Sequence, residues 1–458
     1  MLSLILDTDS YKHSHYRQYP PGTEHVSSYI EARAGGAFPE AVFFGLQSYL
    51  KTTLSQCVTM ADVDEAARVT RAHGVPFHEA GWRHIVEAHG GALPLEVSAA
   101  PEGTVLPEGN VMVQVVNTDP ECAWLTSFVE TALLRAVWYP TTIATVSWRI
   151  RRLIARAFEA AGGAPDGALD FMLNDFGARG VSSQLSAALG GMAHLLSFEG
   201  TDNLAGLMAA TRDYGAAITA QSVPAAEHST ITAWGRDGEE DAYRNMMTAF
   251  PGYPIISVVS DSYDLDRAVT EMWGGSLKGI VDASGSRLVV RPDSGDPATI
   301  VVRTVSQLMD AYGAETTPQG LRVLPDRVRV IQGDGVEEES IGAILDAMRQ
   351  AGLAPWNVVF GMGGGLLQKH DRDTLRFAMK ASAIRRDGQW SDIQKKPATD
   401  PTKASKPGRL ALVREGDGYA TVRREDLGGR EDVLRPVWRD GALLVEEAWD
   451  AVQARVRG

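Results

Sequence analysis

The stretch IISVVSDSYD at residues 255–264 places an apolar, β-like segment directly before a cluster of polar side chains. The same arrangement recurs at residues 288–295 (LVVRPDSG), 328–335 (VRVIQGDG) and 358–365 (VVFGMGGG). Polar groups at the C-terminal ends of successive strands are how α/β barrels build one cleft from many segments. Carboxylates, arginine and exposed glycine backbone together suit a phosphorylated sugar and its metal better than an apolar ligand.

Eight β-like runs lie in the middle of the chain, and helix-compatible segments separate most of them. They lie near residues 168–173, 194–198, 216–221, 255–260, 287–291, 328–331, 357–360 and 377–382. Short apolar runs that alternate with helical stretches predict parallel βαβ units. Eight such units would close an irregular (β/α)8-like barrel, and a doubly wound open sheet is the alternative.

The two ends of the chain have a different pattern, with short alternating segments and turns rich in Gly, Pro and Asn. We therefore expect residues 1–130 and 396–458 to form a second, mostly β domain beside a barrel domain of residues 131–395. A basic run lies near the second boundary and consists of Lys395, Lys396, Lys403, Lys406 and Arg409. Such a run serves either as a lid for a polyphosphate or as a solvated linker.

Composition narrows the class of protein. The 458 residues are 44% hydrophobic and 22% charged, which is ordinary for a folded enzyme-sized chain. A net charge of −14 disfavours a nucleic-acid partner. The N-terminal apolar run is too short for a signal peptide, and no run is long enough to span a bilayer, so we expect no membrane association. Cys57 and Cys122 are too few for a disulfide framework, which favours the cytoplasm.

His228 lies at an expected strand-to-helix turn, where Ser229 or Thr230 is able to cap the following helix. An imidazole there can move a proton or act as a nucleophile, and Glu227 and Asp261 are the acidic candidates to orient it. A structural histidine that caps the helix explains the spacing equally well.

The segment 174–180 (NDFGARG) follows the first expected strand. Phe176 could stack on a flat ring and Arg179 could clamp a phosphate, although an ordinary turn with one buried Phe has the same pattern. The chain contains no G-x-x-x-x-G-K-[ST] loop and no dinucleotide fingerprint in this segment, so any nucleotide is held in another way.

Ten blocks, taken in order, resemble the nicotinamide phosphoribosyltransferase family. They are residues 8–12 (TDSYK), 19–21 (YPP), 175–177 (DFG), 179–183 (RGVSS), 200–202 (GTD), 222–235 (SVPAAEHSTITAWG), 258–264 (VVSDSYD), 291–295 (RPDSG), 331–336 (IQGDGV) and 363–369 (GGGLLQK). The resemblance implies a type II phosphoribosyltransferase fold and a homodimer with active sites at the subunit interface. It also implies that nicotinamide and 5-phosphoribosyl 1-pyrophosphate, with Mg²⁺, give nicotinamide mononucleotide and pyrophosphate in NAD salvage. Family members also hydrolyse ATP and transiently phosphorylate the histidine that corresponds to His228.

The resemblance also assigns roles to individual residues. Phe176 and Tyr11 of the partner subunit correspond to the rings that sandwich the pyridine, and Asp202 to the carboxylate that accepts the amide N–H. Asp261 corresponds to the residue that orients His228. The residues that correspond to phosphate, pyrophosphate, ribose or metal contacts are Arg179, Arg291, Asp293, Asp334, Gly333, Gly363, Gly364 and Arg372. The partner subunit is expected to contribute Arg33, Lys395 and Lys403, which correspond to contacts with pyrophosphate and the ATP phosphates. Asp9 is expected at the same subunit interface.

Three other functions are compatible with parts of this pattern. Nicotinate phosphoribosyltransferase is the nearest, but the Asp202 carboxylate would repel the carboxylate of nicotinic acid. A non-catalytic nucleotide-binding protein on the same scaffold would have little reason to keep His228, Asp293 and Asp334. The third is a barrel aldolase or lyase that uses Lys380 as a Schiff-base amine.

Overall fold

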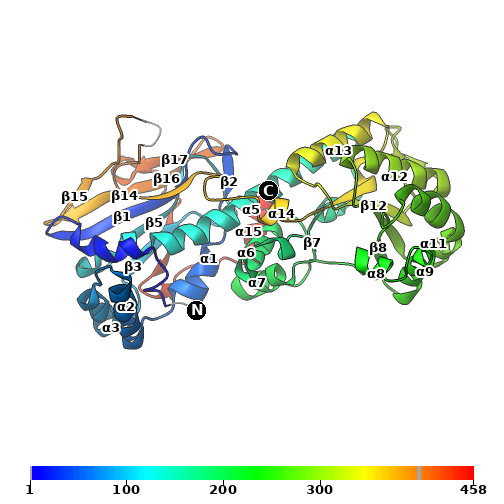
Figure 1. Cartoon of the computed structure of the whole chain (residues 1–458). Coiled ribbons are helices and arrows are strands. Elements are labelled where there is room, and N and C mark those ends of the chain that lie inside the picture. Colours follow the sequence, from blue (N-terminus) through cyan, green and yellow to red (C-terminus); the bar gives the residue numbers. More distant parts are fainter. Residues whose placement is uncertain (1–2, 400–403) are drawn as a thin grey trace. The chain divides into compact units, whose positions relative to one another are not determined.

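The computed structural model describes residues 3–399 and 404–458, and the chain forms two compact units (Figure 1). Unit 1 comprises Met1–Thr145, Ala209–Ala217 and His370–Gly458, and unit 2 comprises Val146–Met208 and Ile218–Lys369. Helices α5 (Glu130–Ala160) and α7 (Leu204–Tyr214) each contribute residues to both units. Within the described residues, no helix is long and apolar enough to cross a membrane.

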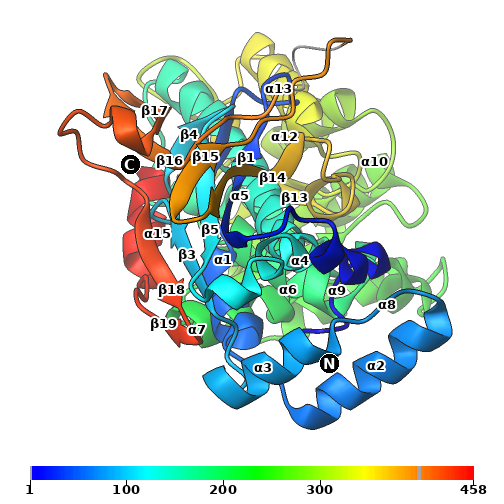
Figure 2. The same cartoon turned by 90° about the vertical axis from the view of Figure 1, so that its left-hand side faces the viewer.

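Unit 1 contains a seven-stranded antiparallel sheet that combines both ends of the chain (Figure 2). The strand order is β15 (Gln389–Asp392), β14 (Phe377–Arg386), β1 (Thr23–Ala32), β5 (Val111–Asn117), β3 (Leu95–Ala99), β18 (Arg435–Arg439) and β19 (Ala442–Leu443). The expected mostly β part made from N- and C-terminal strands is therefore present. Its core joins strand residues such as Val97 and Val115 to helix residues such as Trp82 and Phe128, all nearly fully buried.

Shorter elements complete unit 1. The helices are η1 (Ser10–Arg17), α1 (Leu46–Tyr49), η2 (Leu50–Leu54), α2 (Met60–His73), α3 (Glu79–His89), η3 (Pro120–Cys122), α4 (Leu125–Phe128), η9 (Arg424–Asp426) and α15 (Trp449–Arg457). Two small antiparallel pairs are β2 (Glu40–Val42) with β4 (Val105–Pro107), and β16 (Leu410–Glu415) with β17 (Gly418–Arg423).

Unit 2 is built on a six-stranded parallel sheet. The order is β7 (Gly200–Thr201), β6 (Leu173–Asp175), β13 (Val358–Met362), β12 (Val328–Gln332), β9 (Arg287–Arg291) and β8 (Ile255–Val259). Four of these strands, β8, β9, β12 and β13, confirm the four expected runs that end in polar residues. Because parallel neighbours end at the same edge, those polar residues are brought to one side of unit 2.

Helices connect most of these strands. They are η4 (Ala168–Phe171), η5 (Ala178–Gly180), α6 (Gln184–His194), α8 (His228–Thr232), α9 (Glu239–Ala249), α10 (Leu265–Arg267), η6 (Ala268–Ser276), α11 (Lys278–Ala283), α12 (Pro297–Tyr312), α13 (Glu338–Gln350), η7 (Pro355–Asn357) and α14 (Gly364–Leu367). The two-residue strands β10 (Glu315–Thr316) and β11 (Arg322–Val323) pair with each other.

The expected set of eight barrel strands needs correction. The run at 377–382 belongs to β14, which pairs antiparallel with β1 in unit 1. The run at 194–198 starts at the last residue of α6, and the strand follows at β7. The run at 168–173 is mostly the turn η4, and β6 begins at its last residue. Short apolar runs have no periodicity that separates a buried helix end from a strand, or one sheet from another.

The run at 216–221 forms no regular strand, but the segment that follows it joins the two edges of the parallel sheet. Thr201 N donates to Gln221 O over 3.0 Å at the β7 edge. At the β8 edge, Ser257 N donates to Pro224 O and Ala226 N donates to Ser257 O, each over 2.9 Å. Unit 2 is therefore a half-barrel of six parallel strands, and this extended segment hydrogen-bonds to both of its edges.

A buried carboxyl group ties residues 209–217 to the rest of unit 1. Glu102 accepts hydrogen bonds from the backbone N–H groups of Gly45 and Gln47 and from the Tyr214 hydroxyl. The Tyr214 ring also stacks on Phe44 at a centroid distance of 5.1 Å. Burial raises the pKa of Glu102 to about 7, although these hydrogen bonds oppose the shift.

This buried carboxyl predicts a pH-dependent stability. The pKa of Glu102 is about 7 in the folded chain and near 4.5 in an unfolded one. Folding therefore takes up a proton when the pH lies between about 4.5 and 7. The stabilising contribution of protonated Glu102 is complete below pH 4.5, falls by roughly 3 kcal/mol as the pH rises to about 7, and is then constant. Urea unfolding at pH 5 and pH 7.5 measures the slope, and Glu102→Gln, which cannot ionise, should reduce it. An unchanged slope in this variant would assign the pH dependence to other groups.

Candidate functional site

His228 is the first residue of α8 and follows directly from the segment that joins the sheet edges. Its Nε2 lies 3.1 Å from Asp261 Oδ1, and its Nδ1 lies 3.8 Å from Asp293 Oδ2. The His228 side chain is 47% exposed, whereas that of Asp261 is only 5% exposed. The imidazole therefore lies between two carboxylates with one side open to solvent.

Asp261 is held rigidly by the neighbouring strand end. Its Oδ2 accepts hydrogen bonds from the backbone N–H of Asp293 over 3.0 Å and from the Ser294 hydroxyl over 2.6 Å. Its Oδ1 faces His228, so one carboxylate links the ends of β8 and β9 and orients the imidazole. Since an ionised carboxylate only accepts hydrogen bonds, the neutral imidazole carries its proton on Nε2 and leaves the lone pair on Nδ1.

The other acidic candidate has a different partner. The Glu227 carboxylate accepts a hydrogen bond from the Ser229 hydroxyl, and Glu227 is the residue that precedes α8. The Thr230 hydroxyl bonds back to the Glu227 carbonyl. The prediction that Ser229 or Thr230 caps this helix is wrong. The helix begins at His228, so both residues lie inside it.

Arg291 and Phe176 meet beside Asp293. Arg291 donates from Nη2 over 2.7 Å and from Nε over 3.1 Å to Asp293 Oδ1. The guanidinium carbon lies 5.8 Å from the centre of the Phe176 ring. A Cβ at Gly333 would come within 3.2 Å of Arg291 Nε, so the glycine leaves room for this arginine.

The position of Phe176 depends on the strand next to it. Its backbone N–H donates to Met362 O over 3.0 Å, which extends the pairing of β6 with β13. A Cβ at Gly361 would lie 2.0 Å from the Phe176 ring, far inside van der Waals contact. Glycine at this position is therefore a condition for the half-buried position of the ring.

Asp202 and the glycines around α14 lie at the other strand ends. Asp202 is exposed and accepts a hydrogen bond from the Ser222 hydroxyl over 2.5 Å. Gly363 precedes α14, and a Cβ on Gly364, the first residue of that helix, would have no atom within 4 Å. Gly180, which follows the exposed Arg179, lies against Gly364.

Asp334 is exposed after β12. Within residues 3–399 and 404–458, its carboxylate has no hydrogen-bond or ion-pair partner, in contrast to Asp293. Its oxygens are therefore available to a ligand or a cation.

The remaining candidate residues belong to unit 1. Tyr11 is 56% exposed, with the Lys12 ammonium 5.4 Å from its ring centre, and Asp9 accepts a hydrogen bond from Thr131 over 2.7 Å. The others are Arg33, which donates to Arg376 O over 3.0 Å, Arg372, which pairs with Asp373 over 2.9 Å, and Lys395, whose backbone N–H donates to Ser405 over 2.9 Å. Lys403 lies outside the described residues.

Two serines in unit 2 were not among the residues singled out from the sequence. Ser294 holds Asp261 and Ser222 holds Asp202, each through its hydroxyl. Both lie inside conspicuous blocks, but serine is so common in turns that its type alone gives no signal.

Comparison with known proteins identifies the family of the chain. A model of the nicotinamide phosphoribosyltransferase N-terminal domain matches residues 3–97, and a model of the nicotinate phosphoribosyltransferase (NAPRTase) family matches residues 171–433. A nicotinamide phosphoribosyltransferase from Xanthomonas campestris pv. campestris is 49% identical over 99% of this chain and 97% of its own length. One from Acinetobacter baylyi is 30% identical over 98% of this chain and 96% of its own length.

The chain belongs to the nicotinamide phosphoribosyltransferase family. This is an enzyme family of NAD salvage, as the sequence resemblance predicts. Solved structures agree on the fold, which is that of the type II phosphoribosyltransferases. A nicotinate-nucleotide pyrophosphorylase from Pyrococcus furiosus has a TM-score of 0.64 at 17% identity, covering 99% of this chain and 95% of its own. Human nicotinic acid phosphoribosyltransferase has a TM-score of 0.55 at 18% identity, covering 98% and 92%.

Lys380 does not lie on a barrel strand, which removes the basis of the lyase alternative. It belongs to β14 of the antiparallel sheet, and its ammonium donates to Met379 O over 2.8 Å. Burial lowers the pKa of its ammonium group.

Proposed function

We propose that this chain transfers the phosphoribosyl group of 5-phosphoribosyl 1-pyrophosphate to nicotinamide, giving nicotinamide mononucleotide and pyrophosphate. The observation that carries the proposal is the convergence of an aromatic ring, an arginine and two acidic groups beyond the ends of β6, β8 and β9. The high identity to a nicotinamide phosphoribosyltransferase over nearly the whole chain supports the same reaction.

In this proposal Phe176 binds one face of the pyridine ring, and the guanidinium of Arg291 next to it binds phosphate oxygens. Displacement at the anomeric carbon passes through an oxocarbenium-like state, which needs no covalent help from the protein. It needs the pyridine nitrogen aligned behind the anomeric carbon and positive charge around the departing pyrophosphate. Arg179, Arg372 and the open backbone of Gly363 and Gly364 would supply further phosphate contacts.

Asp202 would select the amide over the acid. Its exposed carboxylate can accept the N–H of nicotinamide but repels the carboxylate of nicotinic acid. The Ser222 hydroxyl fixes one of its oxygens and leaves the other available for the substrate.

Asp293 and Asp334 fit a Mg²⁺ ion, because hard cations prefer carboxylate oxygens. Asp334 is exposed, and its carboxylate has no partner in the described part of the chain. Arg291 binds only Oδ1 of Asp293, so this pair does not use Asp293 Oδ2. Bound there with the substrate, Mg²⁺ would neutralise part of the pyrophosphate charge. Asp293 would also keep Arg291 in position.

We propose that ATP phosphorylates His228. With Nε2–H donated to Asp261, the Nδ1 lone pair attacks the γ-phosphorus, a N–P bond forms, and ADP departs as its bridging P–O bond breaks. Water later hydrolyses the phosphohistidine to phosphate. Lys395, Lys403 and Arg33 would bind the polyphosphate, and the positive charge that the phosphorylated imidazole keeps on Nε2–H is stabilised by Asp261.

The active enzyme in this proposal is a homodimer that shares its sites. The exposure of Tyr11 supports a role in a second subunit's site, because it leaves much of the aromatic ring available for contact with a ligand. Asp9 lies two residues away and holds this segment through Thr131. A cytoplasmic setting is consistent with the two unpaired cysteines.

The reaction is tested by product formation from labelled nicotinamide and labelled nicotinic acid, each with 5-phosphoribosyl 1-pyrophosphate and Mg²⁺, with and without ATP. We expect mononucleotide from nicotinamide, and Asp202→Ala should lower the preference for the amide by about tenfold or more, because a like-charge contact disappears. Product mainly from nicotinic acid would assign the sister activity. Product from neither base would support a binding protein.

His228→Ala should abolish the stimulation of turnover by ATP and leave slow transfer at high substrate concentration, because the transfer step itself uses no protein nucleophile. ATP hydrolysis and product formation are measured in the same reaction. His73→Ala, an exposed histidine on α2, is the matched control and should behave as the wild type. ATP stimulation that survives in His228→Ala would rule out the phosphohistidine.

Mixed dimers test whether the site is shared. Tyr11→Ala and Phe176→Ala chains should each be weakly active alone, and a verified heterodimer should regain one intact site with roughly half of the wild-type activity per dimer. The heterodimer is purified with two different affinity tags. If it stays as inactive as its parents, both rings belong to the same chain's site.

A further inference from the structure

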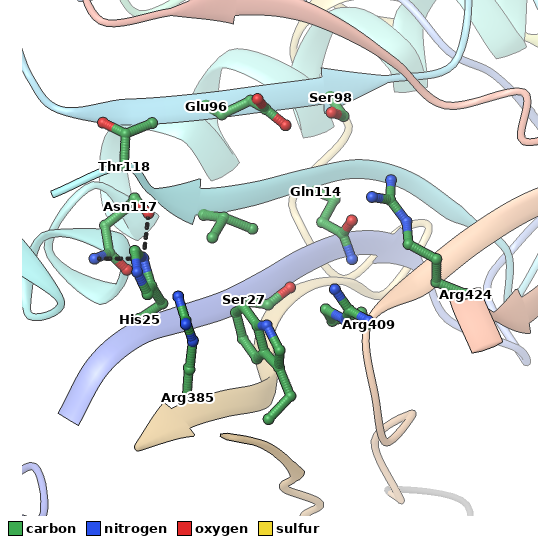
Figure 3. A pocket seen from close by; sticks show the side chains of 12 residues that line it. His25, Ser27, Glu96, Ser98, Gln114, Asn117, Thr118, Arg385, Arg409 and Arg424 are labelled. Carbon is green, nitrogen blue, oxygen red and sulfur yellow. Dashed lines mark hydrogen bonds between the residues drawn. The ribbon is translucent and has the colours of Figure 1, made fainter. Parts of the chain in front are cut away.

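A polar pocket of about 240 Å³ lies in unit 1 and contains none of the residues assigned to the active site (Figure 3). Its floor is the face of the antiparallel sheet opposite the hydrophobic core. Ser27 of β1, Ser98 of β3 and Gln114 of β5 line it, while their neighbours Val97 and Val113 lie in the core. The walls include Arg385 and Trp390 of β14 and β15, and Arg409 and Arg424.

Two buried polar groups at the floor have no partner in the described part of the chain. Gln114 is 5% exposed and Ser27 is 0% exposed, yet neither Gln114 Nε2 nor Ser27 Oγ makes a hydrogen bond. An unpaired buried donor costs about 1–3 kcal/mol, and folded proteins rarely leave one without a ligand or water. Gln114 Nε2 can only donate a hydrogen bond and the Ser27 hydroxyl is able to donate one, so an acceptor in the pocket would satisfy both groups.

The arrangement of the arginines indicates the charge of that partner. Figure 3 shows the Gln114 amide pointing toward Arg409, with the Arg424 side chain on the other side of Gln114. Arg409 stacks on the Trp390 ring at 5.3 Å and has no ion-pair partner within residues 3–399 and 404–458. An anion in the pocket would satisfy both the Arg409 guanidinium, which has no acidic partner in the described part of the chain, and the unpaired Gln114 amide donor.

Nearby acids do not neutralise the pocket. Glu96 is the one acidic residue in its lining, and this carboxylate forms an ion pair with Arg439 outside it. Arg385 meets Glu24 at 3.3 Å and Arg424 meets Asp432 at 3.4 Å, so each keeps other guanidinium N–H groups for a ligand. A local excess of arginine in a chain with net charge −14 points to a specific anion.

We propose that this pocket binds the phosphoryl group of a small metabolite. A phosphate has three oxygens on a tetrahedral centre, so it can accept from Gln114, Ser27 and the Arg409 fork from different directions, whereas the acceptor sites of a carboxylate lie in one plane. The volume is below the usual range for drug-sized ligands, so the pocket takes a phosphate with a small body and excludes a polymer. The His25 Nδ1–H is already donated to Asn117 O over 2.8 Å, which leaves Nε2 for the body of the ligand.

The test measures binding of inorganic phosphate, ribose 5-phosphate and adenosine monophosphate by isothermal titration calorimetry at low salt. All titrations use an Arg179→Gln background, which removes a proposed active-site phosphate contact. We expect at least one of the three to bind, and Arg409→Gln and Gln114→Leu each to weaken it by about tenfold or more. Arg414→Gln is the matched control, because Arg414 is an exposed arginine on β16 that contacts Tyr419 and lies outside the pocket.

The ranking of the three probes identifies the source of the phosphoryl group. Equal affinity in Arg409→Gln, Gln114→Leu and the control would overturn the proposal, as would a dissociation constant above about 10 mM for every probe, which would mean an adventitious ion only. If either variant fails to fold, wild-type crystals soaked in tungstate provide the decisive measurement. Anomalous density between Gln114 and Arg409 is expected, and its absence there would overturn the assignment.

Discussion

The geometry of unit 2 depends on the segment at 221–226, which hydrogen-bonds to β7 at one edge of the parallel sheet and to β8 at the other. A parallel sheet of six strands has two open edges, and unpaired edge groups are costly when they are buried. The segment satisfies both edges without regular strand pairing. It begins next to Ser222 and ends two residues before His228, so closing the sheet also positions the partner of Asp202 and the imidazole.

Asp261 connects the ends of neighbouring strands in a similar way. One of its oxygens orients His228, and the other accepts from the Asp293 backbone and the Ser294 hydroxyl. A nearly buried carboxylate is stable only when its lone pairs are occupied, and here the partners come from two neighbouring loops. The loop after β9 therefore cannot move without loosening the imidazole. Arg291 binds the Asp293 carboxylate, and the backbone N–H of Asp293 donates to Asp261, so Arg291 and Asp293 are coupled to His228 through Asp261.

Sequence patterns predicted the strands that end in polar residues, because β8, β9, β12 and β13 are apolar runs bounded by turn residues. They did not predict which sheet a run joins. Phe377–Arg386 has the composition of a barrel strand, but pairing with β1, some 350 positions earlier in the chain, decides its place. The candidate site was found mainly through blocks that resemble a family, whereas Ser222 and Ser294 gave no signal. Their function arises only when strand ends that are distant in sequence lie side by side.

The glycines at the strand ends show why residue type alone does not predict which of them could contact a ligand. From the sequence, Gly333, Gly361 and Gly364 are equivalent, each exposing backbone that a phosphate could approach. In the structure, the Phe176 ring occupies the space that a side chain at Gly361 would need. A side chain at Gly333 would press against Arg291. Only Gly364 leaves its Cβ direction empty. Gly361 and Gly333 therefore leave room for side chains of the protein itself, whereas the space beside Gly364 at the start of α14 stays open.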